Sequence, residues 1–382
     1  MSIHTLTVNT NITPKLTDEH DKFSMILDIL HDYARLHKLK LIPESSNHNS
    51  EQFYLFIDNM NKNNIKKAHR DMWTLCLPGS GLKIIMIRTR GKNLKKSFFN
   101  CYISYLINPA RVLGGRYVDT FNSNMTAALL SSVNGLLEEI SPLLPKIDYS
   151  RLKRVDFCRN IQLSDSDKVK CYIELAKRAL NPKGYGIKPL ANRDGKEYFP
   201  DNSVTFVKGH TSIVLYDKYS QMQRKPKYFS EEETEDAYGV LRVEIQVEKT
   251  KLYYIRQKND IDSITGFLTQ ADKLATGLFN YHLYKFFLKG EYQTFPDAIE
   301  AIDKSEYKPK AKDDMRLILK YVSDFQSLNK GIEFLNNNGY KRDKLNRLLI
   351  KFDELGVNPV TLPRRWGYKN LPNIAKLVCS SK

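Results

Sequence analysis

Short segments in which apolar and polar residues alternate recur along the first two thirds of the chain, and this period of two is typical of β-strands with one buried face. The clearest segment is residues 241–248, in which leucine, valine and isoleucine alternate with arginine, glutamate and glutamine. Similar runs rich in β-branched and aromatic residues predict further strands. They are residues 53–58, 73–77, 82–90, 97–107, 151–163, 203–210 and 211–219, the last two forming a hairpin around Gly209.

Apolar residues spaced three and four positions apart predict helices before and between these strands. The first helix begins at an N-cap, Thr17, and places apolar residues such as Phe23 and Leu30 on one face. Two more helices are predicted at residues 122–144 and 165–180. After about residue 260 the pattern is helical, with breaks at proline and glycine.

These elements predict an α+β fold with a mainly antiparallel central sheet flanked by helices, followed by a helical, basic C-terminal region. A length of 382 residues favours more than one domain. We expect an N-terminal helical segment at 1–45, a sheet domain at 46–258 and a helical accessory or DNA-recognition region at 259–382. In the last region, residues 317–334 and 341–355 have the dimensions of a helix-turn-helix, although the Asn-Asn-Asn-Gly between them is also an ordinary helix stop.

The chain is strongly basic. It carries 60 Lys and Arg against 43 Asp and Glu, a formal net charge of +17. Such an excess favours a polyanionic partner, above all nucleic acid, over a merely solvated basic surface. Residues 60–100 hold ten basic side chains and one acid, and residues 329–382 hold eleven and four. Aromatic residues are interleaved in both regions, as expected of a surface that pairs with phosphates and stacks on bases.

The cysteines and the N-terminal residues indicate in which cellular compartment the protein is expected. Five scattered cysteines without a C-x-x-C pair support neither a zinc site nor a disulfide framework, which favours a reducing cytosol. The N-terminal residues lack an apolar signal segment, and no apolar run is long enough to span a membrane. We therefore expect a cytoplasmic protein without a membrane partner.

Two of the predicted strands carry a carboxylate beside an arginine on the face opposite their apolar residues. Asp156 follows Arg154 in one strand, and Glu244 follows Arg242 in the other. Such pairs commonly form ion pairs across or along a sheet. If the two strands are neighbours, Asp156 and Glu244 can instead hold Mg²⁺ or Mn²⁺ through hard oxygen ligands and polarise a phosphate. The residues alone leave both interpretations open.

Tyr216 ends the apolar run of the strand at 211–219, and Lys218 follows two residues later. A tyrosine at a strand end commonly packs in a core. A phenol is a weak nucleophile at its ordinary pKa of about 10, but a nearby metal or lysine favours the phenolate, which can attack a phosphodiester. His210, six residues earlier, is either a turn residue or a metal ligand or proton shuttle. Tyr219 either packs against its neighbours or serves as a second tyrosine that accepts the DNA phosphate.

Four phrases of the sequence occur in the order and with the gaps found in one known family. They are CYISYLINPARVLGG, RLKRVDFCRNI, SVTF followed by IVLYDKYSQ, and LRVEIQVEKTKLYYIR. Together they resemble the replication initiators of the filamentous-phage gene II/X family, which has plasmid relatives among rolling-circle Rep proteins. The likeness covers roughly residues 95–260.

The resemblance implies a nicking and closing enzyme that starts rolling-circle replication. Tyr216 matches the family's nucleophile, Lys218 its basic companion, and Asp156 and Glu244 its ligands for Mg²⁺ or Mn²⁺. Such an enzyme keeps the 5′ phosphate on tyrosine and leaves a 3′ hydroxyl that primes synthesis. Its expected partners are single-stranded or supercoiled origin DNA and the helicase and polymerase of a bacterial host, and the sequence allows a homodimer. The basic residues expected to contact DNA are Arg154, Arg242, Lys92, Lys95, Lys96, Arg364 and Arg365.

The sequence departs from the family in the strand before the proline phrase, where Ser104 stands in place of an acid. A third carboxylate ligand from that strand is therefore not expected, and Asp217 is the candidate substitute. The chain also has no H-x-H motif, which excludes the two-histidine metal site of other tyrosine nickases. Two other functions fit these features: a non-catalytic copy-control repressor needs only the basic surface, and a conjugative relaxase shares the nicking chemistry.

Overall fold

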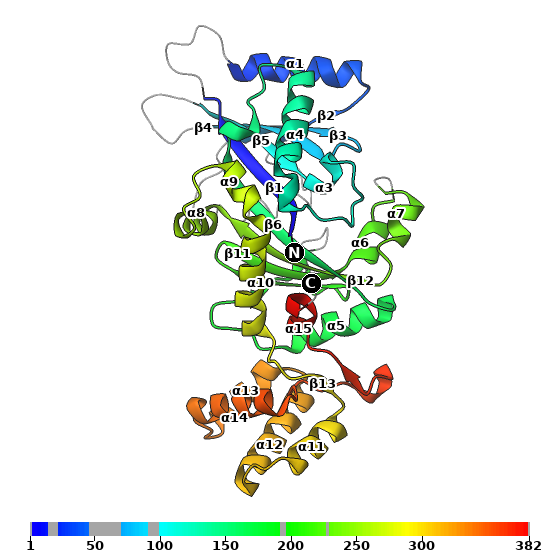
Figure 1. The fold of residues 1–382 in the computed structure, drawn as a ribbon, viewed down its shortest axis with the longest axis vertical. Coiled ribbons are helices and arrows are strands. Elements are labelled where there is room, and N and C mark those ends of the chain that lie inside the picture. The colour runs from blue at the N-terminus through cyan, green and yellow to red at the C-terminus, as the bar shows by residue number, and fades with distance from the viewer. Residues whose placement is uncertain are drawn as a thin grey trace. The chain divides into compact units, whose positions relative to one another are not determined.

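The computed structural model of the chain describes residues 2–13, 22–45, 70–90, 99–191, 196–226 and 229–380. It confirms the predicted α+β class, with a ten-stranded antiparallel sheet flanked by helices (Figure 1). The chain divides into two compact units that are each built from several separate segments. Unit 1 comprises residues 1–158, 209–211 and 246–275, and unit 2 comprises residues 159–208, 212–245 and 276–382.

The sheet confirms the strands that were predicted in the described residues and adds three more, β1, β2 and β7. In sheet order the strands are β2 (Leu41–Ser45), β3 (Arg70–Leu77), β4 (Leu82–Arg90), β5 (Phe99–Ile107), β1 (Ser2–Asn11), β6 (Arg151–Gln162), β12 (Val240–Glu248), β11 (Thr211–Asp217), β10 (Ser203–Lys208) and β7 (Gly186–Ile187). Gly209 joins β10 to β11 with φ +53°, as a tight hairpin turn requires. The strand predicted at 53–58 lies outside the described residues.

The N-terminal segment predicted to be helical begins with a strand, because β1 is a central strand that lies between β5 and β6. Leu6 and Thr7 are successive residues that point to opposite faces, and each is 1 % exposed. Both faces of β1 are thus covered, and its threonines and asparagines conceal the alternation by which a half-buried strand is recognised. The predicted helix follows as α1 (Lys22–Leu36), whereas its expected N-cap, Thr17, lies outside the described residues.

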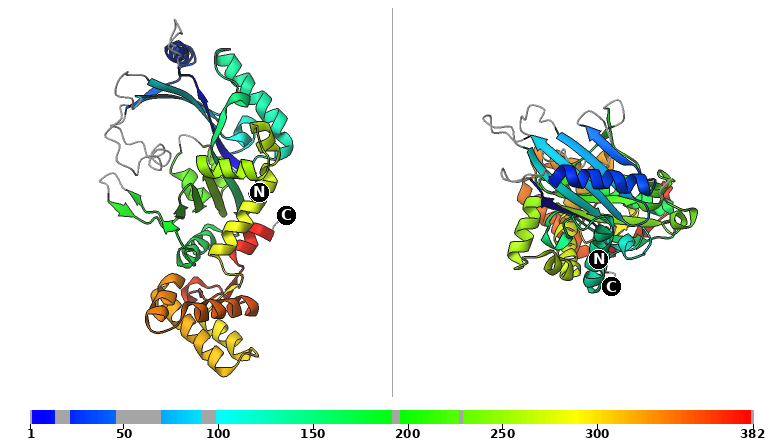
Figure 2. Two further views of the ribbon diagram at one scale, coloured as in Figure 1. Left: turned by 90° about the vertical axis from the view of Figure 1, so that its left-hand side faces the viewer. Right: turned by 90° about the horizontal axis from the view of Figure 1, so that it is seen from above.

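Helix α4 covers one face of the unit 1 strands (Figures 1 and 2). It buries Leu129, Val133 and Leu137, and after it the hydroxyl of Tyr105 on β5 donates to the carbonyl of Pro145 at 2.8 Å. In the described residues of this unit the helices are α1, α3 (Pro109–Val112), η2 (Ser123–Met125), α4 (Thr126–Ile140), η3 (Ile147–Tyr149), α8 (Lys249–Lys258) and α9 (Ile264–Thr269). Helix α10 (Ala271–Phe286) begins in this unit and ends in unit 2.

Unit 2 combines its strands with the remaining helices. These are α5 (Ser166–Arg178), α6 (Lys218–Gln223), α7 (Glu231–Glu235), α11 (Phe295–Lys304), α12 (Pro309–Phe325), α13 (Leu328–Asn337), α14 (Arg342–Leu355), η4 (Arg364–Trp366) and α15 (Ile374–Ser380). Two small ribbons complete it, β8 (Leu190–Ala191) with β9 (Glu197–Tyr198) and β13 (Tyr292–Gln293) with β14 (Asn370–Leu371). The ribbon β13–β14 ties the C-terminal arm to the start of the helical region.

The prediction of one helix at 317–334 is wrong. Helix α12 ends at Phe325, since Gln326 adopts a left-handed conformation with φ +49°. Ser327 then caps α13 by accepting a hydrogen bond from the Lys330 amide. The sequence signal of this break was weak, because the apolar spacing continues through it. The helix predicted at 341–355 is confirmed as α14.

None of the helices in the described parts of the chain is long and apolar enough to cross a membrane.

Gly331 allows α13 to pack closely on α12. A Cβ atom at Gly331 would lie 2.9 Å from the amide nitrogen of Val322. We expect Gly331→Ala to lower the free energy of unfolding by about 1–3 kcal/mol, because backbone must move to relieve the overlap.

The matched control is Gly277→Ala on helix α10 of the same unit, where the space around the added methyl group is open. This change should raise stability by about 0.5–1 kcal/mol through helix propensity alone. Urea unfolding followed by circular dichroism measures the change in the free energy of unfolding for both variants. Equal effects of the two substitutions would contradict the close approach of α12 and α13.

Candidate functional site

The candidate site lies where strand β11 changes into helix α6. Tyr216 is the last residue but one of β11, and Asp217 ends the strand and is the N-cap of α6. The Asp217 carboxylate accepts hydrogen bonds from the amide and the hydroxyl of Ser220. The cap stops the strand immediately after Tyr216 and fixes the direction in which the chain leaves the sheet. Asp217 therefore has a structural role at this point.

Tyr216 and Glu244 are brought together by neighbouring strands. The Tyr216 hydroxyl donates to Oε1 of Glu244 on β12 at 2.7 Å. Both residues are buried, Tyr216 at 8 % exposure and Glu244 at 5 %. A hydrogen bond to a carboxylate in so dry an environment is strong, and it gives the phenolic proton a defined acceptor. Two residues proposed from the sequence for one site thus share a direct contact.

Lys218 adds a cation beside the same tyrosine. It is the first residue of α6 and is fully buried. Its ammonium nitrogen lies 5.8 Å from the centre of the Tyr216 ring and donates to Oε1 of Gln221 at 2.9 Å. The ammonium group places a positive charge beside the Tyr216 ring. The arrangement has an acid–base partner on one strand and a positive charge on the following helix.

Arg242 shares a face of β12 with Glu244, two residues away. It is fully buried, and its Nε donates to Oδ1 of Asn160 on β6 at 2.6 Å. The guanidinium thus links β12 to β6 inside unit 2. This burial argues against the predicted contact of Arg242 with DNA.

Asp156 is engaged by Arg154 on its own strand. The Nε and Nη2 atoms of Arg154 donate to the two carboxylate oxygens of Asp156 at 2.6 and 3.0 Å. The two residues therefore form the ion pair that was one of the two interpretations of this motif. Asp156 belongs to unit 1, whereas Tyr216 and Glu244 belong to unit 2.

The donor set for a divalent cation is small. No cluster of three or more His, Cys, Asp or Glu side chains suited to a metal occurs among the residues that the structure describes. Mg²⁺ commonly binds one or two carboxylates and completes its shell with water and substrate phosphates. Glu244 fits that mode, since it offers a carboxylate at the Tyr216 hydroxyl, whereas both carboxylate oxygens of Asp156 accept hydrogen bonds from Arg154. On β5, Ser104 instead donates to the side chain of Asn9 on β1.

The two other residues considered for chemistry have separate settings. His210 is exposed in the β10–β11 turn, six residues before Tyr216, and its carbonyl accepts from the Glu248 amide at 3.0 Å. The Tyr219 hydroxyl donates to Glu235 on α7 at 3.2 Å. Desolvation and the negative charge of Glu235 raise the pKa of Tyr219, so this phenol stays protonated at neutral pH.

The residues predicted to bind DNA fall into three groups. Lys92, Lys95 and Lys96 lie outside the described residues. Arg154 and Arg242 are engaged by partners on the sheet. Arg364 and Arg365 are exposed on η4, where they remain available for phosphate contacts.

Sequence reasoning missed Asn160 and Gln221, which hold Arg242 and Lys218. Gln221 is three residues after Lys218 on α6, so a helical spacing could have suggested it. Asn160 carried no comparable signal, because its pairing with Arg242 depends on which strands are neighbours.

Comparisons with known proteins add no family to this geometry. No family model matches the sequence, and a search of curated proteins finds no match.

Proposed function

We propose that the chain is a DNA nicking and closing enzyme that initiates rolling-circle replication, with Tyr216 as its nucleophile. The observation that carries this proposal is the 2.7 Å hydrogen bond from the Tyr216 hydroxyl to Glu244. A nucleophile held on a general base is the minimal arrangement for covalent catalysis by a hydroxyl group. The family resemblance of the sequence around Tyr216 supports the same assignment.

The first step forms one bond and breaks another. The Tyr216 oxygen attacks the phosphorus of a phosphodiester in the origin strand, and the bond from phosphorus to the 3′ oxygen breaks. The phenolic proton passes to Glu244, and the departing 3′ oxygen takes a proton from Lys218 or from water. The 5′ phosphate stays on Tyr216, and the released 3′ hydroxyl serves as a primer for the host polymerase.

The second step is the reverse reaction with a new strand end. After one round of synthesis, a 3′ hydroxyl attacks the phosphotyrosine, the bond from phosphorus to the tyrosine oxygen breaks, and a proton returns to Tyr216. The bond energy is conserved in the protein–DNA link, so no external energy source is required for closure. A host helicase would separate the strands between the two steps, in the cytoplasm of a bacterial host.

A bound Mg²⁺ or Mn²⁺ would polarise the scissile phosphate and stabilise the charge on the departing oxygen. Glu244 would hold it together with phosphate oxygens of the DNA. The net charge of +17 and the exposed Arg364 and Arg365 supply the attraction for the DNA backbone.

The burial of Tyr216 favours a second candidate function. At 8 % exposure the side chain is also suited to a purely structural bond between β11 and β12. In that case the chain would be a non-catalytic, sequence-specific DNA-binding protein such as a copy-control repressor. A conjugative relaxase would share the chemistry of the first candidate and differ in the fate of the nicked strand.

Replacement of Tyr216 by Phe separates the two candidates. We expect Tyr216→Phe to abolish nicking of supercoiled DNA that carries the replicon's own origin, while DNA binding is retained, because only the attacking oxygen is lost. A denaturing gel run after incubation with Mg²⁺ or Mn²⁺ detects the covalent protein–DNA adduct. Tyr219→Phe is the control and should keep the adduct, since its hydroxyl contacts Glu235. Persistence of the adduct in Tyr216→Phe would refute the assignment.

Replacement of Glu244 by Gln tests its role as the general base that receives the proton of Tyr216. Gln keeps an oxygen that can accept the Tyr216 hydrogen bond but removes the charge that receives the proton. We expect the single-turnover rate of cleavage at saturating DNA to fall by about 10²–10⁴-fold. Glu235→Gln, which changes the carboxylate beside Tyr219, should leave this rate unchanged. A wild-type rate in Glu244→Gln would show that Glu244 acts neither as base nor as metal ligand.

A further inference from the structure

Helix α8 of unit 1 exposes two neighbouring tyrosines (Figure 1). Tyr253 is 59 % exposed and Tyr254 is 62 % exposed. Leu252 and Ile255 are buried and anchor the opposite face of the helix. Single exposed apolar residues are ordinary on protein surfaces, but two adjacent aromatic rings expose a large apolar area. Because the buried pair already holds α8 in place, the tyrosines are available for another partner.

The two rings contact each other in a way that leaves ring faces open. Their centres are 5.7 Å apart and their planes meet at 70°, which is an edge-to-face arrangement. In this arrangement the edge of one ring covers one face of the other, so the remaining faces stay uncovered by the pair. Among the described residues, neither side chain has another ring contact, a hydrogen bond or an ion pair. The open faces can stack on planar rings of a ligand.

The helix that carries these rings is basic. It contains three lysines and one arginine and no acidic residue. The acids nearest in the sequence, Glu248, Asp260 and Asp262, lie beyond its two ends. Arg256 is engaged by the loop that follows the helix, where it donates to two backbone carbonyls. The lysines are therefore the cations that α8 can offer to a polyanion.

Lysines and tyrosines share the exposed face of α8. Residues four positions apart are neighbours on a helix, so Lys249 and Tyr253 form one row and Tyr254 and Lys258 form the next. Lys249 and Lys258 are both exposed. A positive charge thus lies one helical turn from each ring. Flat aromatic groups with adjacent cations are the combination that binds a nucleic acid strand through its bases and its phosphates.

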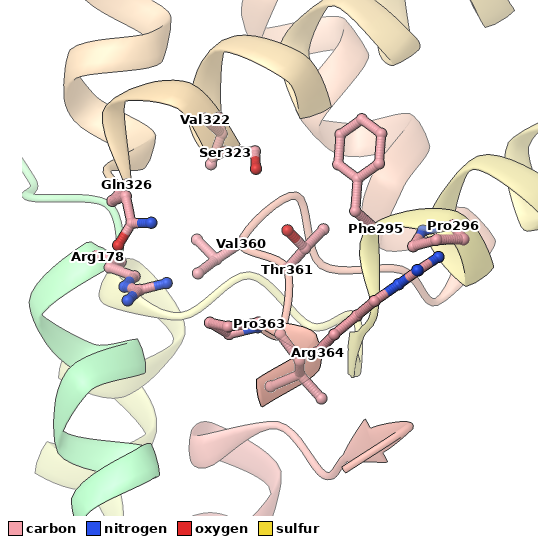
Figure 3. Close-up of a pocket in the computed structure, with 11 residues that line it drawn as sticks. Arg178, Phe295, Pro296, Val322, Ser323, Gln326, Val360, Thr361, Pro363 and Arg364 are labelled. Atoms are coloured by element: carbon pink, nitrogen blue, oxygen red, sulfur yellow. The ribbon is translucent and has the colours of Figure 1, made fainter. Parts of the chain in front are cut away.

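A cavity of about 430 Å³ in unit 2 lacks this arrangement. Residues of α5, α11 and α12 and of the segment 360–364 line it (Figure 3). Its two arginines, Arg178 and Arg364, lie on opposite sides, and Arg178 has Glu174 nearby as an anion. The two guanidinium groups of this arginine-lined cavity therefore do not form one phosphate site. The basic groups of α8, by contrast, share one exposed face.

We propose that the exposed face of α8 binds single-stranded DNA, with Tyr253 and Tyr254 stacked on unpaired bases and the lysines beside phosphates. The bases of a duplex are already stacked on one another, so the tyrosines favour a single strand over a duplex. Every base has a planar face, so this binding is tolerant of sequence. The inference rests on the proposed function and deepens it, because it names the surface that holds the unpaired strand of the origin.

The test is a titration of fluorescently labelled oligo(dT) with the full chain, followed by fluorescence anisotropy. We expect the double substitution Tyr253→Ala and Tyr254→Ala to weaken binding by about tenfold or more, because both stacking rings are lost. The affinity for a duplex of the same length should change little. The double substitution Tyr253→Phe and Tyr254→Phe should bind oligo(dT) like the wild-type chain, since the ring and not the hydroxyl group stacks.

Tyr149→Ala is the matched control. Tyr149 belongs to the same unit, lies on η3 and is 81 % exposed. Its substitution removes an exposed tyrosine from outside α8 and should leave oligo(dT) binding unchanged. Lys258→Gln tests the phosphate contact. It should weaken binding and lower the slope of log affinity against log salt concentration by about 0.7, as expected for one phosphate contact with a single strand.

Three results would each overturn the proposal. They are absence of oligo(dT) binding by the wild-type chain, an equal loss of duplex binding in the alanine double variant, and wild-type oligo(dT) affinity in that variant. The last result would leave the tyrosines as a surface for a protein partner. Tyr216→Phe should bind oligo(dT) normally, because Tyr216 lies outside α8. Loss of the covalent adduct and loss of binding to α8 are therefore distinguishable.

Discussion

The hydrogen bond between Tyr216 and Glu244 is the interaction on which the functional account depends. It joins β11 to β12 at 2.7 Å between two buried side chains. In such surroundings a phenol and a carboxylate hold each other in one geometry, because neither has water as an alternative partner. The Asp217 cap ends the strand one residue later and places Lys218 beside the same ring. Local backbone geometry and one buried bond thus bring together a phenol, a carboxylate and a cation.

The fold was predictable where one face of a strand is apolar. The alternation in 241–248 predicted β12, and β-branched runs predicted β3, β4 and β5. It was not predictable at β1, where both faces are covered and Thr7 is as buried as Leu6. The break at Gln326 was also hidden, because a left-handed residue interrupts a helix without changing its apolar spacing. Tertiary packing decided both cases.

The candidate site was predictable in its residue types but not in its pairings. Tyr216 and Glu244 could be named from strand faces and from a family resemblance, yet their contact depends on β11 and β12 being neighbours. The polar face of β12 was expected to form an ion pair or a metal site, and the bond from Arg242 on that face to Asn160 was not foreseen. The arginine-lined cavity had no sequence signal, since Arg178 and Arg364 lie far apart in the chain.

The most direct measurement is the identity of the residue that becomes linked to DNA. The full chain is incubated with origin DNA and Mg²⁺ or Mn²⁺, digested with protease and nuclease, and the modified peptide is sequenced by mass spectrometry. The account predicts a nucleotide joined by phosphate to Tyr216 and to no other tyrosine. A link at Tyr219 or elsewhere, or specific origin binding with no linked peptide at all, would contradict it.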